Sequence, residues 1–311
     1  MQSRFRSDRR LTVRMGLTLF LLGLLYVGFV AALIVLLKSW LLVVVLIGAM
    51  FVAQFWFSDR IAMFAMRGRV VEREEYPELH AVVDRLCAIA DMPKPVVAVS
   101  EMDMPNAFAT GRNPDHAVVC VTTGLLRRLE PAELEGVLAH ELSHVAHKDV
   151  AVITIASFLG VVAGLIVRFA FYSQLLGGGR RDQNTAAVLA VVIGVSAAVY
   201  AISFLLIRAL SRYRELAADR AAAHLTGRPS ALASALTKVS GDIARIPTKD
   251  LRTAQAFNAF YFTPATGKEP GVERFFSTHP PLRQRLDQLG RISAELGEAA
   301  VPGTAPREPA D

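Results

Sequence analysis

Residues 131–167 read PAELEGVLAHELSHVAHKDVAVITIASFLGVVAGLIV, so a polar segment with three histidines runs directly into a long apolar segment. A spacing of four residues turns a helix by about 400°, and His140 and His144 therefore project from one face and can share a tetrahedral metal ion. Glu141 stands where this motif places the base that takes a proton from metal-bound water. The stretch predicts a catalytic zinc site beside a membrane span. An ordinary polar helix face is the alternative.

The composition indicates a membrane protein. Of the 311 residues, 53% are hydrophobic, and the mean hydropathy is +0.38. A helix of about 20 apolar residues crosses a hydrocarbon core about 30 Å thick. We expect four transmembrane helices in the uncharged runs at residues 15–37, 39–58, 150–167 and 185–207. Arg168 interrupts the third run but can reach the lipid headgroups from its end. A buried soluble hairpin is the alternative there.

Arginines beside these runs predict the orientation, because basic residues near spans accumulate on the cytoplasmic side. Most of them lie in three segments, at residues 4–14, 60–69 and 208–214. Of the two opposite loops, the first carries only Lys38. The second carries Arg180 and Arg181, whose charge is partly offset by Asp182. We therefore expect a multi-pass protein of the plasma (cytoplasmic) membrane with its catalytic domain in the cytoplasm. The first run exceeds a signal-peptide core in length, which favours an uncleaved amino terminus.

The net charge of +6 does not call for nucleic acid. The excess is largely juxtamembrane arginine, which anionic lipid attracts, and no base-reading motif is visible. Cys87 and Cys120 lack CxxC spacing and fall in a predicted cytoplasmic segment, so neither a disulfide nor a thiolate metal site is indicated. The expected partners are the lipid bilayer and protein or peptide substrates, which we expect to be membrane proteins, with no nucleic acid.

The spans divide the chain into six segments. These are a cytoplasmic arm (1–14), a transmembrane hairpin (15–58), the first part of a protease domain (59–149), a second hairpin (150–207), the second part of that domain (208–296) and a disordered tail (297–311). Short β-branched runs at 96–100 and 117–123 predict a small sheet. Apolar periodicity predicts helices over 75–91 and 231–246, and a further helix opens at Glu130-Pro131 and carries the motif.

A hydrolytic zinc site needs three protein ligands and one open position, so the two histidines require a partner. Glu215 lies seven residues after Arg208, where the fourth run ends, and His144 lies six residues before Val150, where the third begins. If these runs form an antiparallel hairpin whose helices continue past the bilayer, both residues lie about 9–10 Å above it. His147 competes, but about 10 Å of axial rise separates it from the first histidine of the motif.

At this point the chain resembles the HtpX-like membrane zinc endopeptidases, gluzincin-type relatives of the eukaryotic CAAX prenyl protease. Besides the motif, the resemblance rests on residues 106–111 (NAFATG), on Glu215 followed four residues later by Asp219, and on His279-Pro280 followed by Arg285. It implies one zinc ion per chain. The fold class expected is an α-helical membrane protein with a mainly α (α+β) gluzincin-type zinc protease domain and a small β-sheet.

The resemblance also implies roles for the additional residues. One segment would form an edge strand that pairs with substrate backbone, namely Asn106, Ala107, Phe108, Ala109, Thr110 and Gly111. Without the resemblance this segment is predicted to be a loop with a Thr-Gly turn. Asp219 would accept the spare N–H of a ligand histidine, which we expect to be His140. His279 and Arg285 would bind the substrate carbonyl or stabilise the developing oxyanion.

Three of these assignments have alternatives. Asp149 matches a family position, but it could equally cap or charge-balance the helix at the membrane surface. His279 could instead be a surface residue that initiates a helix. Arg285 could be a plain surface or lipid-facing arginine, and Arg283 lies close enough in the chain to be confused with it.

The function expected is zinc-dependent peptide hydrolysis, with zinc held by His140, His144 and Glu215 and with Glu141 as general base. The resemblance implies quality control of misfolded membrane proteins. A narrow-specificity processing protease is one alternative, and a non-catalytic zinc-binding membrane scaffold or carrier is another. Aromatic residues within 247–272 could line a substrate groove under a lid, although a packed aromatic cluster is the competing interpretation.

Overall fold

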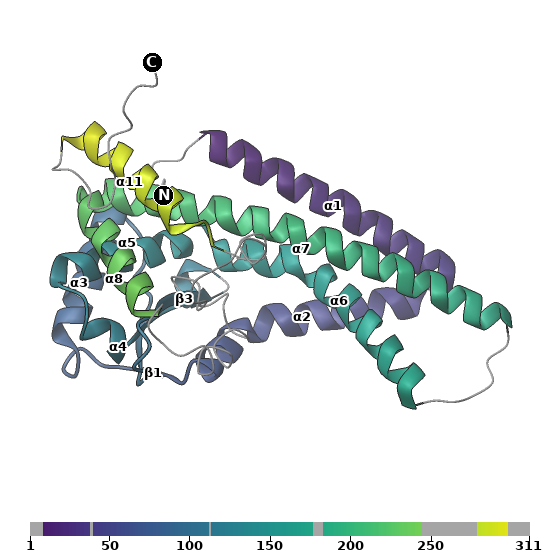
Figure 1. Cartoon of the computed structure of the whole chain (residues 1–311). Helices are drawn as coiled ribbons and strands as arrows, with labels where there is room; N and C mark the ends of the chain where they lie inside the picture. Colours follow the sequence, from purple (N-terminus) through teal and green to yellow (C-terminus); the bar gives the residue numbers. More distant parts are fainter. Residues whose placement is uncertain (1–8, 38–39, 112, 177–182, 244–278, 298–311) are drawn as a thin grey trace, which may run out of the picture. The chain divides into compact units, whose positions relative to one another are not determined.

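The computed structural model describes residues 9–37, 40–111, 113–176, 183–243 and 279–297 (Figure 1). Predictions about residues 247–272, the tail from 298 onward, the loop at 177–182, Lys38 and the first eight residues lie outside the described parts of the chain. The chain forms two compact units. One comprises Val13–Phe57 and Val152–Leu210, and the other comprises Met1–Thr12, Ser58–Ala151 and Ser211–Asp311.

The first unit is built from most of three long helices, α1 (Arg9–Leu37), α2 (Trp40–Ala65) and α6 (Asp149–Leu176), and the first part of α7 (Gln183–Thr226). The start of α6, with Asp149, belongs to the other unit. The core of the first unit is apolar and includes Leu22, Phe29, Ala163 and Val199. The Tyr26 hydroxyl donates to the carbonyl of Ala156 at 2.6 Å, which ties α1 to α6. Such helices satisfy their backbone polar groups internally, as hydrocarbon surroundings demand.

Three helical stretches in the described part of the chain are long and apolar enough to cross a membrane: Thr12–Val35, Ala151–Arg168 and Ala186–Thr226. They correspond to the first, third and fourth predicted spans. The second predicted span falls on α2, whose described side chains give only the shorter apolar stretch Val45–Gln54, and it remains a prediction. The α-helical, membrane-protein fold class is confirmed.

The second unit contains a four-stranded sheet in the order β1-β2-β4-β3. Its strands are β1 (Gly68–Val70), β2 (Val96–Ser100), β3 (Ala107–Gly111) and β4 (Ala117–Thr122). β2 and β4 are parallel, and the outer strands pair antiparallel to them. The small predicted sheet is therefore present. β3 lies at the sheet's edge, so the prediction of a loop, made without the resemblance, is wrong for this segment.

Pairing with β4 makes a strand of residues 107–111. The segment has few β-branched residues, so its local preference for a strand is weak. Asn106 anchors its start, because its N–H donates to Thr122 Oγ1 at 2.8 Å and its carbonyl accepts the Thr122 N–H at 2.9 Å. At the other end Gly111 has a φ of +135°, a conformation that favours glycine.

Helices α3 (Pro77–Ala90), α4 (Thr123–Leu126), α5 (Pro131–Ala146), α8 (Pro229–Ile243) and α11 (Leu282–Leu296) complete this unit with the end of α7. Its core includes Leu86, Val119, Leu138, Leu142, Leu236 and Leu289. A capping box of Glu130 and Glu133 starts α5, with proline in its first turn. Glu133 is buried and also contacts Ser234 and Lys238 of α8, which ties the two helices together.

Candidate metal centre

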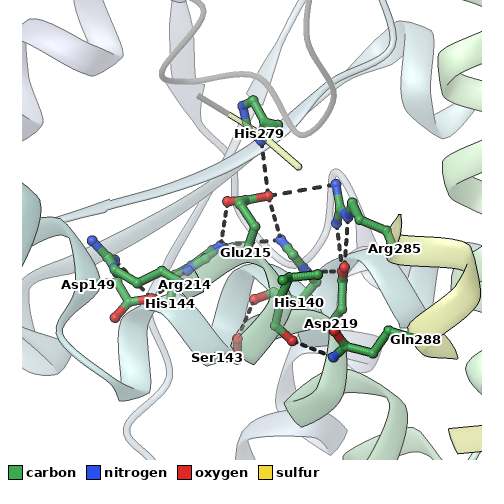
Figure 2. Close-up of polar contacts among 11 residues, drawn as sticks. His140, Ser143, His144, Asp149, Arg214, Glu215, Asp219, His279, Arg285 and Gln288 are labelled. Carbon is green, nitrogen blue, oxygen red and sulfur yellow. Dashed lines mark hydrogen bonds and ion pairs between the residues drawn. The ribbon is translucent and has the colours of Figure 1, made fainter. Parts of the chain in front are cut away.

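Three potential metal ligands converge in the second unit (Figure 2). His140 and His144 come from α5, and Glu215 comes from the end of α7. The two histidine Nε2 atoms are 3.2 Å apart. Glu215 Oε1 lies 3.4 Å from Nε2 of His144, and Oε2 lies 3.7 Å from Nε2 of His140. His147 is not part of this cluster, and its Nδ1 donates to the Ser143 carbonyl at 2.7 Å.

The spacing of these atoms fits a tetrahedral ion. Metal–nitrogen and metal–oxygen bonds of about 2.0–2.2 Å at tetrahedral angles put neighbouring ligand atoms about 3.3–3.5 Å apart. The Nδ1 of each histidine faces an aspartate, which leaves both Nε2 lone pairs directed toward the carboxylate of Glu215. Three electron-rich atoms therefore meet in a buried place, where a cation relieves their mutual repulsion. The residues present fit a metal ion.

Each histidine has its own aspartate, and each aspartate has its own arginine. Asp219 Oδ1 lies 3.0 Å from His140 Nδ1, and Arg285 donates to both oxygens of Asp219 at 2.7 and 2.6 Å. Asp149 Oδ2 lies 2.6 Å from Nδ1 of His144. The same oxygen lies 2.8 Å from Nη2 of Arg214. A carboxylate at the Nδ1 side, as at His144, fixes the tautomer and orientation of a ligand histidine, and Asp219 lies close enough to His140 to act in the same way.

These contacts bear on the alternatives left open for Asp149 and Arg285. Asp149 is the first residue of α6 and also contacts a candidate ligand, so its position suits both interpretations. Arg285 is 1% exposed, and the surface or lipid-facing interpretation is wrong for it. Arg283, two residues earlier on α11, is exposed and is not part of the site. The contacts of Arg285 are carboxylates, Asp219 and, at 3.6 Å, Oε2 of Glu215.

His279 is also buried, so it is not a surface residue. Its Nδ1 lies 3.0 Å from Oε2 of Glu215, on the side of the carboxylate away from α5 (Figure 2). His279 and Arg285 thus place two positively polarised groups around the cluster. Their action on a substrate stays a prediction.

The protonation states suit metal binding. Burial opposes ionisation of Glu215, but His279, His144 and His140 outweigh it and hold the pKa of Glu215 well below its usual value. Burial lowers the pKa of His140, although the neighbouring Asp219 opposes that shift. A neutral imidazole and an ionised carboxylate are the forms that bind metals.

Glu141 projects beside the cluster and is 4% exposed. Burial, reinforced by the charge of Glu215, raises the pKa of Glu141 to about 8, while His144 and the backbone N–H of Ala109 act in the opposite direction. A group that exchanges its proton near neutral pH is suited to general acid–base catalysis. The contact with Ala109 also brings the edge strand β3 next to this carboxylate.

The hydrogen-bonding pattern of β3 leaves part of its backbone unused by the sheet. Asn106 and Thr122 form a hydrogen-bonded pair at the start of the β3–β4 ladder. Hydrogen-bonded and non-hydrogen-bonded pairs alternate along an antiparallel ladder. The N–H and C=O groups of Ala107, Ala109 and Gly111 therefore point away from β4. Ala109 is partly exposed, whereas the side chains of its neighbours in β3 are buried. The sheet does not use these groups, and the N–H of Ala109 contacts Glu141 instead.

Arg214 is the site residue that sequence reasoning did not identify. It stood among the juxtamembrane arginines that predict orientation, yet it is 5% exposed and ion-paired with Asp149. Its only local signal was its position next to Glu215 in the chain.

Comparison with known proteins agrees with this site. The model of peptidase family M48 matches residues 73–293. The chain is 88% identical over 305 residues to "Protease HtpX homolog 1" of Streptomyces coelicolor, covering 98% of this chain and all of that protein. It is 51% identical to "Protease HtpX homolog" of Moorella thermoacetica, covering 96% of this chain and 99% of that protein.

The fold also has a solved counterpart. The crystal structure of S. mikatae Ste24p superposes with a TM-score of 0.50 at 18% identity, covering 91% of this chain and 67% of that one. The resemblance noted in the sequence is confirmed by the family match and by the two relatives. The chain therefore belongs to peptidase family M48, as an HtpX-like membrane metalloprotease.

Proposed function

We propose that this metalloprotease is a zinc endopeptidase that hydrolyses peptide bonds at the cytoplasmic face of the plasma membrane, in quality control of misfolded membrane proteins. The observation that carries the proposal is the convergence of His140, His144 and Glu215, with the carboxylate of Glu141 beside them. A scaffold or metal carrier would need the three ligands but not the buried base.

The chain's own residues supply most of the mechanism. Zinc held by the three ligands would act as a Lewis acid on the scissile carbonyl and lower the pKa of its bound water. Glu141, buried beside the ligands, would take a proton from the attacking water and return it to the leaving amine. His279 and Arg285 would supply N–H donors where the oxyanion develops.

Substrate would add to the edge of the sheet. An extended peptide beside β3 would pair with outward backbone groups of Ala107 and Gly111 and with the carbonyl of Ala109, whose N–H contacts the base. Main-chain pairing reads little side-chain sequence. Such binding favours broad specificity over the trimming of a single partner and supports a role in clearing misfolded proteins.

The position of the ligands along their helices supports a membrane-surface location. The apolar run of α7 ends near residue 207, and Glu215 follows on the same helix. His144 comes six residues before the third apolar run. Glu215 would lie about 10 Å from the hydrocarbon at 1.5 Å per residue. The rise cannot be counted in this way for His144, because α5 ends at Ala146 and α6 begins at Asp149, but His144 meets Glu215 in the cluster. We propose that residues 59–149 and 208–296 form one catalytic domain on the cytoplasmic side, within reach of loops and loosened ends of membrane proteins.

Purified protein in detergent tests the mechanism by cleavage of casein and of a model membrane protein, with zinc content measured on the same samples. Wild type should cleave and lose activity with a chelator. Glu141→Gln should keep zinc and lose cleavage, and Glu215→Ala should lose zinc. The matched control is Glu135→Gln, because Glu135 lies on the same helix but pairs with Arg85. Normal cleavage by Glu141→Gln, or full zinc in Glu215→Ala, would contradict the assignment.

The quality-control role needs a second comparison. Proteoliposomes would carry the protease with either a folded membrane protein or a destabilised variant of that protein, and the orientation of the protease would be checked by protection of its carboxyl terminus. Faster cleavage of the destabilised variant at several sites supports the proposal. Cleavage of both proteins at one sequence would favour the narrow processing protease.

A further inference from the structure

The two candidate ligand histidines are supported in parallel ways from different parts of the chain (Figure 2). Asp219, which supports His140, lies on the helix that also carries Glu215. Asp149, which supports His144, lies at the start of α6. Its second partner, Arg214, reaches it from α7 at 2.8 Å. The chain Arg214–Asp149–His144 is the second of two arginine–aspartate–histidine chains, and the function proposed above gives it no role.

Arg214 and Asp149 are both 5% exposed, and such buried charges are rarely placed without a partner. One oxygen, Oδ2 of Asp149, contacts both the guanidinium and the imidazole. This shared contact fixes the rotation of the carboxylate that presents Oδ2 to the histidine. Arg214 directly precedes Glu215 in the chain. Two adjacent residues of α7 therefore provide a candidate ligand, Glu215, and the arginine that holds Asp149 against His144.

We propose that Arg214 is a positioning residue of the metal centre, which acts through Asp149 to hold the ring of His144 with Nε2 toward the other two ligands. The inference rests on the metal function proposed above. A carboxylate on the Nδ1 side makes the opposite nitrogen a stronger electron donor, and a fixed ring loses less entropy when the metal binds. A purely structural ion pair between α7 and the start of α6 would change stability but not metal affinity.

Zinc affinity is the decisive measurement, made on the full-length protein in detergent by competition with a chromophoric chelator. Disturbing such an outer partner typically weakens metal binding about 10–100-fold. We expect a loss in that range for Arg214→Gln and for Asp149→Asn. Because the arginine acts through the aspartate, the double variant should bind zinc no more weakly than the weaker single variant. The visible absorption of bound Co²⁺ should shift in all three, because the His144 ring is no longer held in place.

Glu133→Gln is the matched control. Glu133 lies on α5 with His140 and His144, and its buried carboxylate pairs with the partly exposed Lys238 of α8 without touching a ligand. The substitution should lower stability and leave zinc affinity unchanged. If Arg214→Gln does not fold, Arg214→Lys decides the question. It keeps the charge but not the planar donor geometry, and it should still bind zinc about tenfold more weakly than wild type.

Three results would overturn the inference. They are zinc binding by Arg214→Gln or Arg214→Lys within about twofold of wild type, additive losses in the double variant, and an equal loss in the Glu133→Gln control. Failure of the proposed function looks different, since wild type itself would then bind no zinc, or Glu141→Gln would still cleave.

Discussion

Replacing Arg285 with leucine should destabilise the catalytic unit, because it removes the partner of a fully buried carboxylate. Asp219 is 0% exposed and receives two hydrogen bonds from the guanidinium, at 2.7 and 2.6 Å. Removing one partner of a buried ion pair costs about 3–5 kcal/mol. For a unit of this size each kcal/mol lowers the unfolding temperature by about 2–4 °C, so we expect a fall of roughly 6–20 °C.

The cysteines provide the assay. Cys87 and Cys120 are both free and lie in the core of the same unit. Burial raises the pKa of Cys87 to about 11 and that of Cys120 to about 12, so neither is expected to react with a thiol-reactive fluorophore until the unit opens. The rise of fluorescence on heating therefore reports unfolding of the catalytic unit.

Two further variants sharpen the test. Arg283→Leu changes an exposed arginine two residues earlier on α11 and should leave the unfolding temperature within a degree or two of wild type. Combining Arg285→Leu with Asp219→Asn removes the uncompensated charge and should recover part of the loss. If Arg285→Leu unfolds at the wild-type temperature, the reasoning about stability is refuted; a loss of cleavage by that folded variant would then assign Arg285 to the substrate alone.

Three further predictions concern the edge strand and the helix that carries the motif. Gly111→Ala should lower the unfolding temperature, because the added Cβ would overlap the backbone carbonyl of His116 and the residue has a φ of +135°. The strain is of order 1–3 kcal/mol. An unchanged thermal transition would argue against this. Ala109→Pro removes an outward N–H that the sheet does not use, so the variant should keep the fold. It should lower kcat more than Ala107→Pro, which alters the same edge farther from Glu141. Equal effects on kcat would contradict the contact between the Ala109 amide and Glu141. Burial raises the pKa of Glu133, but Lys238 and other partners outweigh it and depress the folded value, so this carboxylate stabilises the protein above its unfolded pKa of about 4.5. The deficit in unfolding temperature of Glu133→Gln relative to wild type should therefore be full near pH 7 and shrink as the pH falls below that value; a deficit independent of pH would show that the charge is not involved.

Much of the site could be predicted from the sequence, because helix geometry is local. The spacing of His140, Glu141 and His144 determines by itself that the histidines share one face and that the glutamate stands beside them. The apolar runs likewise reveal the membrane helices, because a bilayer sets a minimum length. Glu215 was predicted because it follows the fourth apolar run at nearly the same distance at which His144 precedes the third.

Tertiary structure alone decided the rest. β3 is a strand because it pairs with β4, and nothing in its own five residues required that outcome. Arg285 and Asp219 are 66 residues apart in the chain, so their pairing appears only when α11 packs against α7. Arg214 looked like one more juxtamembrane arginine until folding buried it against Asp149. A repeat within one helix follows from backbone geometry, whereas the partner of a buried charge depends on which distant segments the whole fold brings together.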